Sequence, residues 1–141
     1  MLVDSSEREI ISHALGAGHD GNIIAQVGSS GHKVTRQAIK SLKPGVWVKD
    51  EVINSFFHLL SKQDGELCKK DVTRKGNAFF NSFFMTKLLN KGHSTCSREY
   101  DYDNIRNWSK KFVPGKAIFE VDKFFFVINV ERTHWVLAVV D

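Results

Sequence analysis

Three features are absent from the 141-residue sequence, and each absence narrows the class of protein. It has only two cysteines, too few for a disulfide framework, so a reducing compartment fits better. It has no apolar run that approaches about 18 residues, the length that a membrane-spanning helix needs. Its N-terminus turns acidic at Glu7, where a secretory signal peptide would carry its apolar stretch. We therefore expect a protein inside the cell, nuclear or cytoplasmic, with no membrane partner.

The sequence also lacks a strong excess of either charge. Lys and Arg together number 20, and Asp and Glu number 16, so the balance is only mildly basic. The basic residues are scattered in clusters no longer than pairs such as Lys69-Lys70, whereas a nucleic-acid interface concentrates them on one face. This argues against nucleic acid as a partner. A hydrophobic fraction of 42% and a charged fraction of 26% are ordinary for one globular domain of this length.

Capping signals and apolar periodicity divide the first 60 residues. Ser6 opens a capping box for a helix that ends at Gly16, and residues 22–27 contain a short strand. Thr35 caps a brief helix, and Asp50 caps a longer helix with an apolar face. The residues expected on that face are Val52, Ile53, Phe56, Phe57, Leu59 and Leu60.

The second half of the chain alternates polar and apolar segments. Residues 63–76 carry mixed charge without periodicity and predict a surface loop. Residues 77–89 and 101–110 show helical spacing of phenylalanine and other apolar residues. Residues 123–130 and 135–140 are apolar on both faces and predict two buried strands, joined by a short turn. The sequence therefore predicts an α+β fold.

The last predicted strand begins with a histidine, His134. A histidine beside a turn and near solvent can act as a general base, but it can equally be a surface residue without a catalytic role. The residues alone leave both interpretations open. The chain ends at Asp141, directly after its most hydrophobic segment. Because a terminal buried strand leaves an edge and an apolar face uncovered, we expect a fragment of a larger domain.

Four blocks in order along the chain resemble the ubiquitin-like-specific protease family, the sentrin/SUMO-specific cysteine proteases. They are residues 42–54 (LKPGVWVKDEVIN), 80–88 (FNSFFMTKL), 105–108 (IRNW) and 127–141 (VINVERTHWVLAVVD). The resemblance covers nearly the whole chain. It implies a papain-like α+β cysteine protease fold, truncated here after the His-Trp strand. Residues 1–32 would then be an N-terminal helix and lead-in, and residues 33–141 the N-terminal part of the catalytic domain.

The resemblance also implies a mechanism and a set of site residues. In the family, a cysteine thiolate attacks the carbonyl after the Gly-Gly tail of the modifier, and a histidine accepts the thiol proton. His134 matches that histidine, and Trp47 and Trp135 match two indoles that enclose the tail. The positions that match contacts to the globular part of the modifier are Asp50, Phe83 and Thr86. A plain core position is the alternative for Phe83.

The order of the cysteines departs from the family pattern. The family cysteine follows the histidine, whereas Cys68 and Cys96 both precede His134, so neither is expected to be catalytic. His93 and Cys96 have the spacing of metal ligands, but zinc needs four ligands and no second pair is evident. We expect no metal and no cofactor.

These observations predict a cysteine-type peptidase that processes or deconjugates SUMO-like modifiers, with such a modifier and its conjugates as partners. This chain alone is expected to be inactive, because the nucleophilic cysteine and the orienting aspartate would lie beyond its end. One alternative is a non-catalytic modifier-binding fragment or pseudoprotease. A basic nucleic-acid-binding domain is a further alternative, against which the scattered charge argues.

Overall fold

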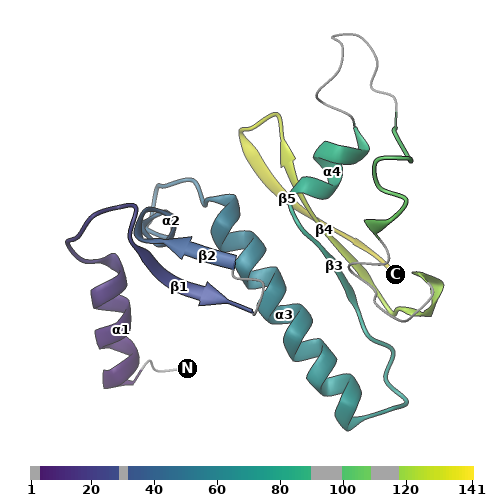
Figure 1. Ribbon diagram of the computed structural model, residues 1–141, viewed down its shortest axis with the longest axis horizontal. Coiled ribbons are helices and arrows are strands. Elements are labelled where there is room, and N and C mark those ends of the chain that lie inside the picture. The colour runs from purple at the N-terminus through teal and green to yellow at the C-terminus, as the bar shows by residue number, and fades with distance from the viewer. Residues whose placement is uncertain (1–3, 29–31, 90–99, 109–117) are drawn as a thin grey trace. The chain divides into compact units, whose positions relative to one another are not determined.

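The computed structural model describes residues 4–28, 32–89, 100–108 and 118–141. The chain forms two compact units, Met1–Phe56 and Phe57–Asp141, and each is described by itself. Figure 1 shows the helices and strands of both. Helices and sheets occur together, as the α+β prediction requires. The division expected at residues 32 and 33 stays a prediction.

The first unit contains two helices, a two-stranded sheet and the start of a third helix. Its elements are α1 (Ser5–Leu15), β1 (Ile23–Val27), β2 (His32–Thr35) and α2 (Arg36–Lys40), followed by the first turns of α3 (Asp50–Lys70). The strands pair antiparallel, with an irregularity in β1 between Ile23 and Ala25. The helix expected after Thr35 is confirmed, because the Thr35 hydroxyl accepts a hydrogen bond from the Ala38 N–H at 3.2 Å.

The N-terminal cap of α1 differs from the prediction. Asp4, rather than Ser6, caps the helix: its carboxylate accepts from the Glu7 N–H at 2.8 Å, and the Glu7 carboxylate accepts from the Asp4 N–H at 3.0 Å. Two overlapping stretches of sequence have capping-box spacing, and the earlier one places a carboxylate at the positive end of the helix. Ala14 of α1 is buried, whereas Ile10 and Ile11 are exposed.

A buried arginine closes the other end of α1. Arg36 is only 4% exposed, and its Nη1 donates to the carbonyl oxygens of His13 and Ala14. These carbonyls belong to the last turn of α1, where no helical partner remains. Gly18, with φ 146°, passes so close that a Cβ atom there would lie 2.8 Å from Arg36 Nε. Glycine at this position therefore allows the arginine to reach the helix end.

Helix α3 is longer than expected, so the surface loop predicted at residues 63–76 is wrong for residues 63–70 and confirmed for residues 71–76. The helix runs to Lys70, because the polar segment is rich in strong helix formers. Lys69 Nζ and Glu66 Oε1 form an i,i+3 ion pair at 2.8 Å on its surface. At its start, the Ile53 N–H donates to the Lys49 carbonyl at 3.3 Å, so Lys49 rather than Asp50 occupies the cap. Of the predicted apolar face, Phe57 is buried, whereas Phe56 and Leu59 are exposed.

The second unit is built on a three-stranded sheet with the order β3-β4-β5. Strand β3 (Ala78–Phe80) pairs parallel with β4 (Phe124–Val130), and β4 pairs antiparallel with β5 (His134–Val140). The strand pair and its turn are confirmed, but the burial expected for both strands is wrong for β5, because most of its aliphatic residues are exposed. The helix predicted for residues 77–89 is wrong in its first part, which is β3, and α4 occupies only Phe83–Leu88. The short η1 helix (Ile118–Glu120) precedes β4.

Aromatic packing explains why β3 is a strand. Phe79 stacks on Phe125 with ring centroids 5.0 Å apart, and Phe80 stacks on Phe126 at 4.8 Å. Phenylalanine favours strands, and these partners lie far along the chain, where local periodicity carries no information. The buried cluster contains Ala78, Phe80 and Val121, with Phe84, Trp108, Phe124 and Phe126 packed against it.

Of the helix predicted for residues 101–110, the described part shows only its residue Trp108 in a helix. Residues 103–107 form turns, and residues 109 and 110 lie outside the described ranges. Trp108 packs edge-on against Phe84 with ring centroids 5.6 Å apart, whereas Tyr102 is exposed. The loop expected to hold His93 and Cys96 also lies outside the described residues.

One carboxylate joins α3 to the segment that enters β3. Asp64 is buried and accepts three hydrogen bonds of 2.7 Å, from Arg74 Nη2, from the Asn77 N–H and from Asn77 Nδ2. Burial alone would raise the pKa of Asp64, but the bonds from Asn77 and Arg74 together hold it below its ordinary value. The carboxylate is therefore charged and fully engaged in the folded protein.

We expect Asp64→Ala to destabilise the protein by about 3 kcal/mol, because it leaves a guanidinium and two amide donors without their acceptor. Because the pKa of Asp64 is lower in the folded than in the unfolded protein, its contribution to stability depends on pH. The contribution is fully present above the unfolded-state pKa of about 3.9, and it is lost as the pH falls through the lower folded-state pKa. Urea unfolding from pH 7 to pH 2 measures both effects. Asp103→Ala removes an exposed carboxylate and should leave the unfolding midpoint nearly unchanged. Equal urea midpoints for Asp64→Ala and Asp103→Ala would contradict the stabilising role of Asp64.

Candidate active site

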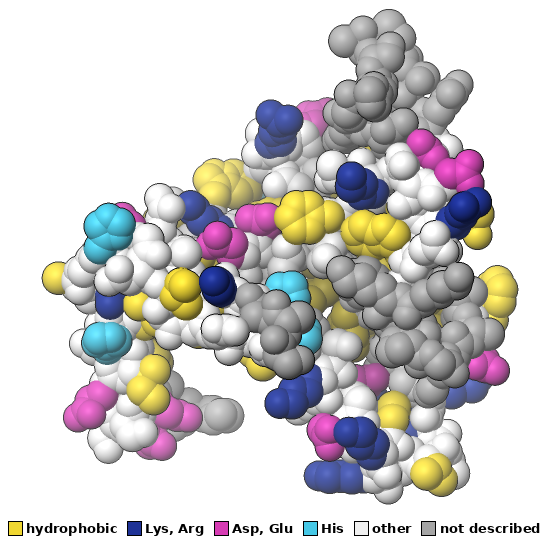
Figure 2. Space-filling view, in the orientation of Figure 1, with side chains coloured by type: hydrophobic (Ala, Val, Ile, Leu, Met, Phe, Trp, Pro, Cys, Tyr) yellow, Lys and Arg dark blue, Asp and Glu magenta, His cyan; other side chains and the backbone are white. Residues whose placement is uncertain are grey.

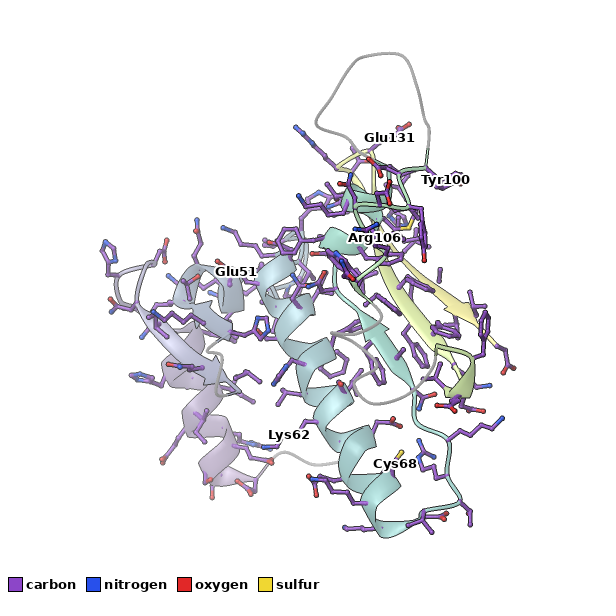
Figure 3. All side chains as sticks on the ribbon, turned by 45° about the vertical axis from the view of Figure 1, so that its right-hand side comes forward. Glu51, Lys62, Cys68, Tyr100, Arg106 and Glu131 are labelled. Carbon is purple, nitrogen blue, oxygen red and sulfur yellow. The ribbon has the colours of Figure 1, made fainter. Side chains whose placement is uncertain are left out.

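The hairpin between β4 and β5 places His134 at its end. Val130 pairs with His134 and Asn129 pairs with Trp135. Glu131 and Arg132 both adopt left-handed conformations, with φ of 51° and 61°, and the Thr133 N–H donates to the Val130 carbonyl at 3.0 Å. Figure 3 shows Glu131 in this turn. The tight connection fixes the first residue of β5 at the solvent, and His134 is exposed there.

Alternation along β5 separates its side chains into two sets. His134 shares one face with Val136, Ala138 and Val140, whereas Trp135 shares the other face with Leu137 and Val139. Trp135 is partly buried, and most of the strand's aliphatic residues remain exposed. The strand thus presents an imidazole and an indole side by side in sequence but on opposite faces.

Asp141 lies at the far end of this strand. Its carboxylate accepts a hydrogen bond from Lys123 Nζ at 2.8 Å, and this bond is the main reason that the pKa of Lys123 is raised. Asp141 lies seven residue steps along the chain from His134, a span of roughly 23 Å in a strand. Asp141 therefore cannot orient the His134 ring, in agreement with the sequence interpretation.

Trp47 and Asp50 belong to the first unit. A turn precedes them, in which the Val46 N–H donates to the Lys43 carbonyl at 3.2 Å and Gly45 adopts φ 76°. The Trp47 side chain is 64% exposed. Asp50 is the first residue of α3 and is partly buried. The indole and the carboxylate thus flank the point where the chain enters the helix.

Phe83 and Thr86 lie three residues apart in α4, in the second unit. Phe83 is 51% exposed, whereas its neighbour Phe84 packs against Phe80 with centroids 4.7 Å apart. Phe84 therefore fills the core position, and the core alternative for Phe83 is wrong. Thr86 is exposed as well. Both side chains are available on the surface of α4.

The six predicted site residues thus fall into two groups. His134, Trp135, Phe83 and Thr86 lie in the second unit, and Trp47 and Asp50 lie in the first. Sequence reasoning missed the polar residues that hold the segment around Trp47, chiefly Ser41 and Glu51. A lone serine after a short helix and a glutamate in a first helical turn carry no pattern that separates them from ordinary surface residues.

The cysteine that the structure describes, Cys68, lies within α3 rather than in the predicted loop, and it is partly buried. Figure 3 shows its side chain on the face of α3 turned toward the segment that leads to β3. That segment contains Arg74, whose pKa is raised chiefly by Asp64 and to a smaller extent by Cys68. Cys68 thus belongs to the Asp64 cluster, and Cys96 lies outside the described residues.

Neither a metal site nor a basic surface is evident in the described parts. No group of three or more His, Cys, Asp and Glu side chains there is placed to hold a metal ion. On the face shown in Figure 2, the visible Lys and Arg side chains of each unit are interspersed with acidic and apolar ones. Within the same residues, no helix is both long enough and apolar enough to cross a membrane.

Comparison with known proteins gives matches across the whole chain. The model of the "Ulp1 protease family, C-terminal catalytic domain" matches residues 46–141. Ubiquitin-like-specific protease 1A of Arabidopsis thaliana is 33% identical over 137 residues, which cover 97% of this chain and 26% of that protein. The chain therefore spans about a quarter of the length of this relative.

Solved structures give the same result for the fold. The SUMO protease Ulp1 with its catalytic cysteine oxidised to a sulfinic acid matches with a TM-score of 0.69 at 25% identity, covering 100% of this chain and 52% of that one. The C-terminal Ulp1 protease domain in complex with Smt3, the yeast ortholog of SUMO, matches with a TM-score of 0.67 at 26% identity, covering 100% and 54%. The predicted α+β protease fold is confirmed, over about half of each solved chain.

Proposed function

The chain belongs to the Ulp1 protease family. We therefore propose that it is part of a cysteine peptidase that processes or deconjugates SUMO-like modifiers after their Gly-Gly tail. The observation that carries this proposal is the placement of His134-Trp135 at the exposed start of β5, inside the segment that matches the catalytic domain. A solved Ulp1 protease domain of the same fold is in complex with Smt3, the yeast ortholog of SUMO. A SUMO-like modifier and its conjugates are accordingly the proposed partners.

In this proposal, His134 is the general base. Its imidazole takes the proton from a cysteine thiol, the thiolate attacks the carbonyl carbon after Gly-Gly, and the imidazolium returns the proton to the leaving amine. The exposed position at the end of the hairpin gives a substrate access to the ring. This chemistry needs only side chains, so the proposal includes neither a metal nor another cofactor.

The other site residues predicted from the sequence are proposed to hold the modifier. Trp47 and Trp135 provide flat surfaces for the Gly-Gly tail, which lacks Cβ atoms and can pass between rings. The globular part of the modifier is proposed to contact three other exposed or partly buried side chains, Asp50, Phe83 and Thr86. Modifier conjugates occur inside the cell, so we place this activity in the nucleus or cytoplasm.

A second candidate is modifier binding without catalysis. It is favoured by one observation, that Cys68 lies in α3 as part of the Asp64 cluster. Binding would then rest on the tryptophans and on α4, without a covalent step.

We expect the 141-residue polypeptide to bind a mature SUMO-like modifier but to neither cleave its precursor nor react with a modifier that carries a thiol-reactive group at its C-terminus. The reason is the lack of a cysteine after His134. Isothermal titration and gel-shift labelling measure the two properties, with the yeast Ulp1 domain as the positive control. Labelling that disappears in Cys68→Ser or Cys96→Ser would identify a nucleophile and contradict the inactivity. Failure to bind any SUMO-like modifier would contradict the proposed function itself.

A further inference from the structure

A buried hydroxyl links α2 to the segment that carries Trp47. Ser41 follows α2 directly and is only 2% exposed. Its Oγ donates to the Ala38 carbonyl of α2 and accepts from the Lys49 N–H at 3.0 Å. Donor and acceptor are thus both satisfied away from water, where such bonds are costly to lose. The Lys49 backbone, two residues after Trp47, is held against α2 by this hydroxyl.

Two further contacts reinforce the same connection. Thr35 Oγ1 donates to Glu51 Oε2 at 3.1 Å, while it also caps α2. On the surface, Lys49 Nζ donates to Gln37 Oε1 at 2.8 Å. Figure 3 shows Glu51 at the beginning of α3. Three links therefore run from α2 and its cap to residues 49 and 51, all within the first unit.

These links matter because residues 46–49 have no regular secondary structure. The turn at Lys43 holds one end of this segment through the Val46 N–H, and Ser41 holds the other end at Lys49. The exposed Trp47 lies between the two fixed points. An aromatic side chain on a segment that is already ordered loses less conformational entropy when it closes on a ligand.

We propose that Ser41 is a positioning residue: it fixes the backbone at Lys49 so that Trp47 is presented in one orientation to the Gly-Gly tail of the modifier, with Glu51 as a second anchor. The choice of the Gly-Gly tail as the ligand rests on the proposed function, whereas the hydrogen bonds around Ser41 are independent of it. Ser41 itself touches no substrate, because its hydroxyl is enclosed by α2 and by the Lys49 backbone.

The test uses the 141-residue chain with 5-fluorotryptophan at its three tryptophans, and Trp47→Phe assigns the Trp47 fluorine signal. In Ser41→Ala, we expect the Trp47 signal to shift or broaden in the free protein, while the signals of Trp108 and Trp135 stay unchanged. Titration with a mature SUMO-like modifier should show an affinity about 5- to 10-fold weaker than that of the parent chain, in keeping with the loss of one buried hydrogen bond.

Matched variants separate positioning from general stability. Ser55→Ala removes another buried serine hydroxyl of the first unit, within α3, and should leave the Trp47 signal and the affinity unchanged. Glu51→Ala removes the acceptor of Thr35 on the surface and should weaken binding about 2- to 3-fold, whereas Glu51→Gln keeps an acceptor oxygen and should restore it.

Each outcome decides a question. A Trp47 signal that is unchanged in both Ser41→Ala and Glu51→Ala overturns the positioning role. If Ser41→Ala loses the native fluorine signals of all three tryptophans, the protein has unfolded. The comparison of Glu51→Ala with Glu51→Gln then decides between a positioning role and a purely structural one. If the parent chain binds no modifier, the proposed function fails, while the signal of Trp47 in the free variants still tests the positioning role.

Discussion

Replacing His134 with alanine should reduce turnover by at least about 1,000-fold while modifier binding persists. The expected loss is large because the substitution removes the group that accepts the thiol proton, and a neutral thiol is a poor nucleophile. The binding surfaces on Trp47, Trp135 and α4 stay in place. The catalytic role and the binding role of the site should therefore separate in this one variant.

The measurement uses a chimaera in which this chain replaces the matching 54% of the yeast Ulp1 protease domain, so that a family cysteine follows the histidine. Cleavage of a SUMO precursor gives kcat/KM, and titration of the mature modifier gives affinity. His13→Ala, which removes an exposed imidazole from α1, is the control and should leave both values unchanged. A His134→Ala chimaera as active as its parent would remove His134 from the proposed site.

The second large effect is expected at Trp135. In the same chimaera, Trp135→Ala should lower kcat/KM by roughly 30- to 1,000-fold, since a buried aromatic contact to a ligand is typically worth about 2–4 kcal/mol when truncated. The fold should persist, because Trp135 is only partly buried and lies on the strand opposite Asn129. Local periodicity in β5 requires an apolar residue at this position but not an indole.

A smaller ring tests whether the flat surface matters. Trp135→Phe keeps an aromatic face and should retain much more activity than Trp135→Ala. Circular dichroism and thermal unfolding establish that each variant is folded. If Trp135→Ala unfolds the chimaera and His134→Ala is fully active, the tryptophan is a core residue and the site assignment fails.

The parts of the fold that the sequence predicts well are those specified by neighbouring residues. The β4–β5 hairpin was predictable because two apolar runs flank a short polar turn, and the Thr35 cap because a hydroxyl residue precedes a short helix. His134 and Trp135 were found through an ordered resemblance over four blocks. Their positions on opposite faces of β5 follow from strand alternation alone.

The parts that failed depend on distant partners or on competing local signals. Phe79 and Phe80 have helical spacing with Phe83, but stacking on Phe125 and Phe126 makes them a strand. The polar segment after residue 62 showed no apolar period, so its helical propensity was overlooked. Asp64 draws its partners from residues 10 and 13 positions away. Ser41 carries no signal at all, because its role depends on a backbone N–H.

The parallel pairing of β3 with β4 has a consequence for the order in which the second unit folds. The β4–β5 hairpin needs only a three-residue connection, so it can form on a timescale of about 1–10 μs. Strand β3 must reach β4 across the whole stretch from Phe80 to Phe124, and this closure costs entropy before the phenylalanine stacks repay it. The strand that presents His134 would therefore be assembled first, and the aromatic cluster of β3, β4 and α4 would consolidate later.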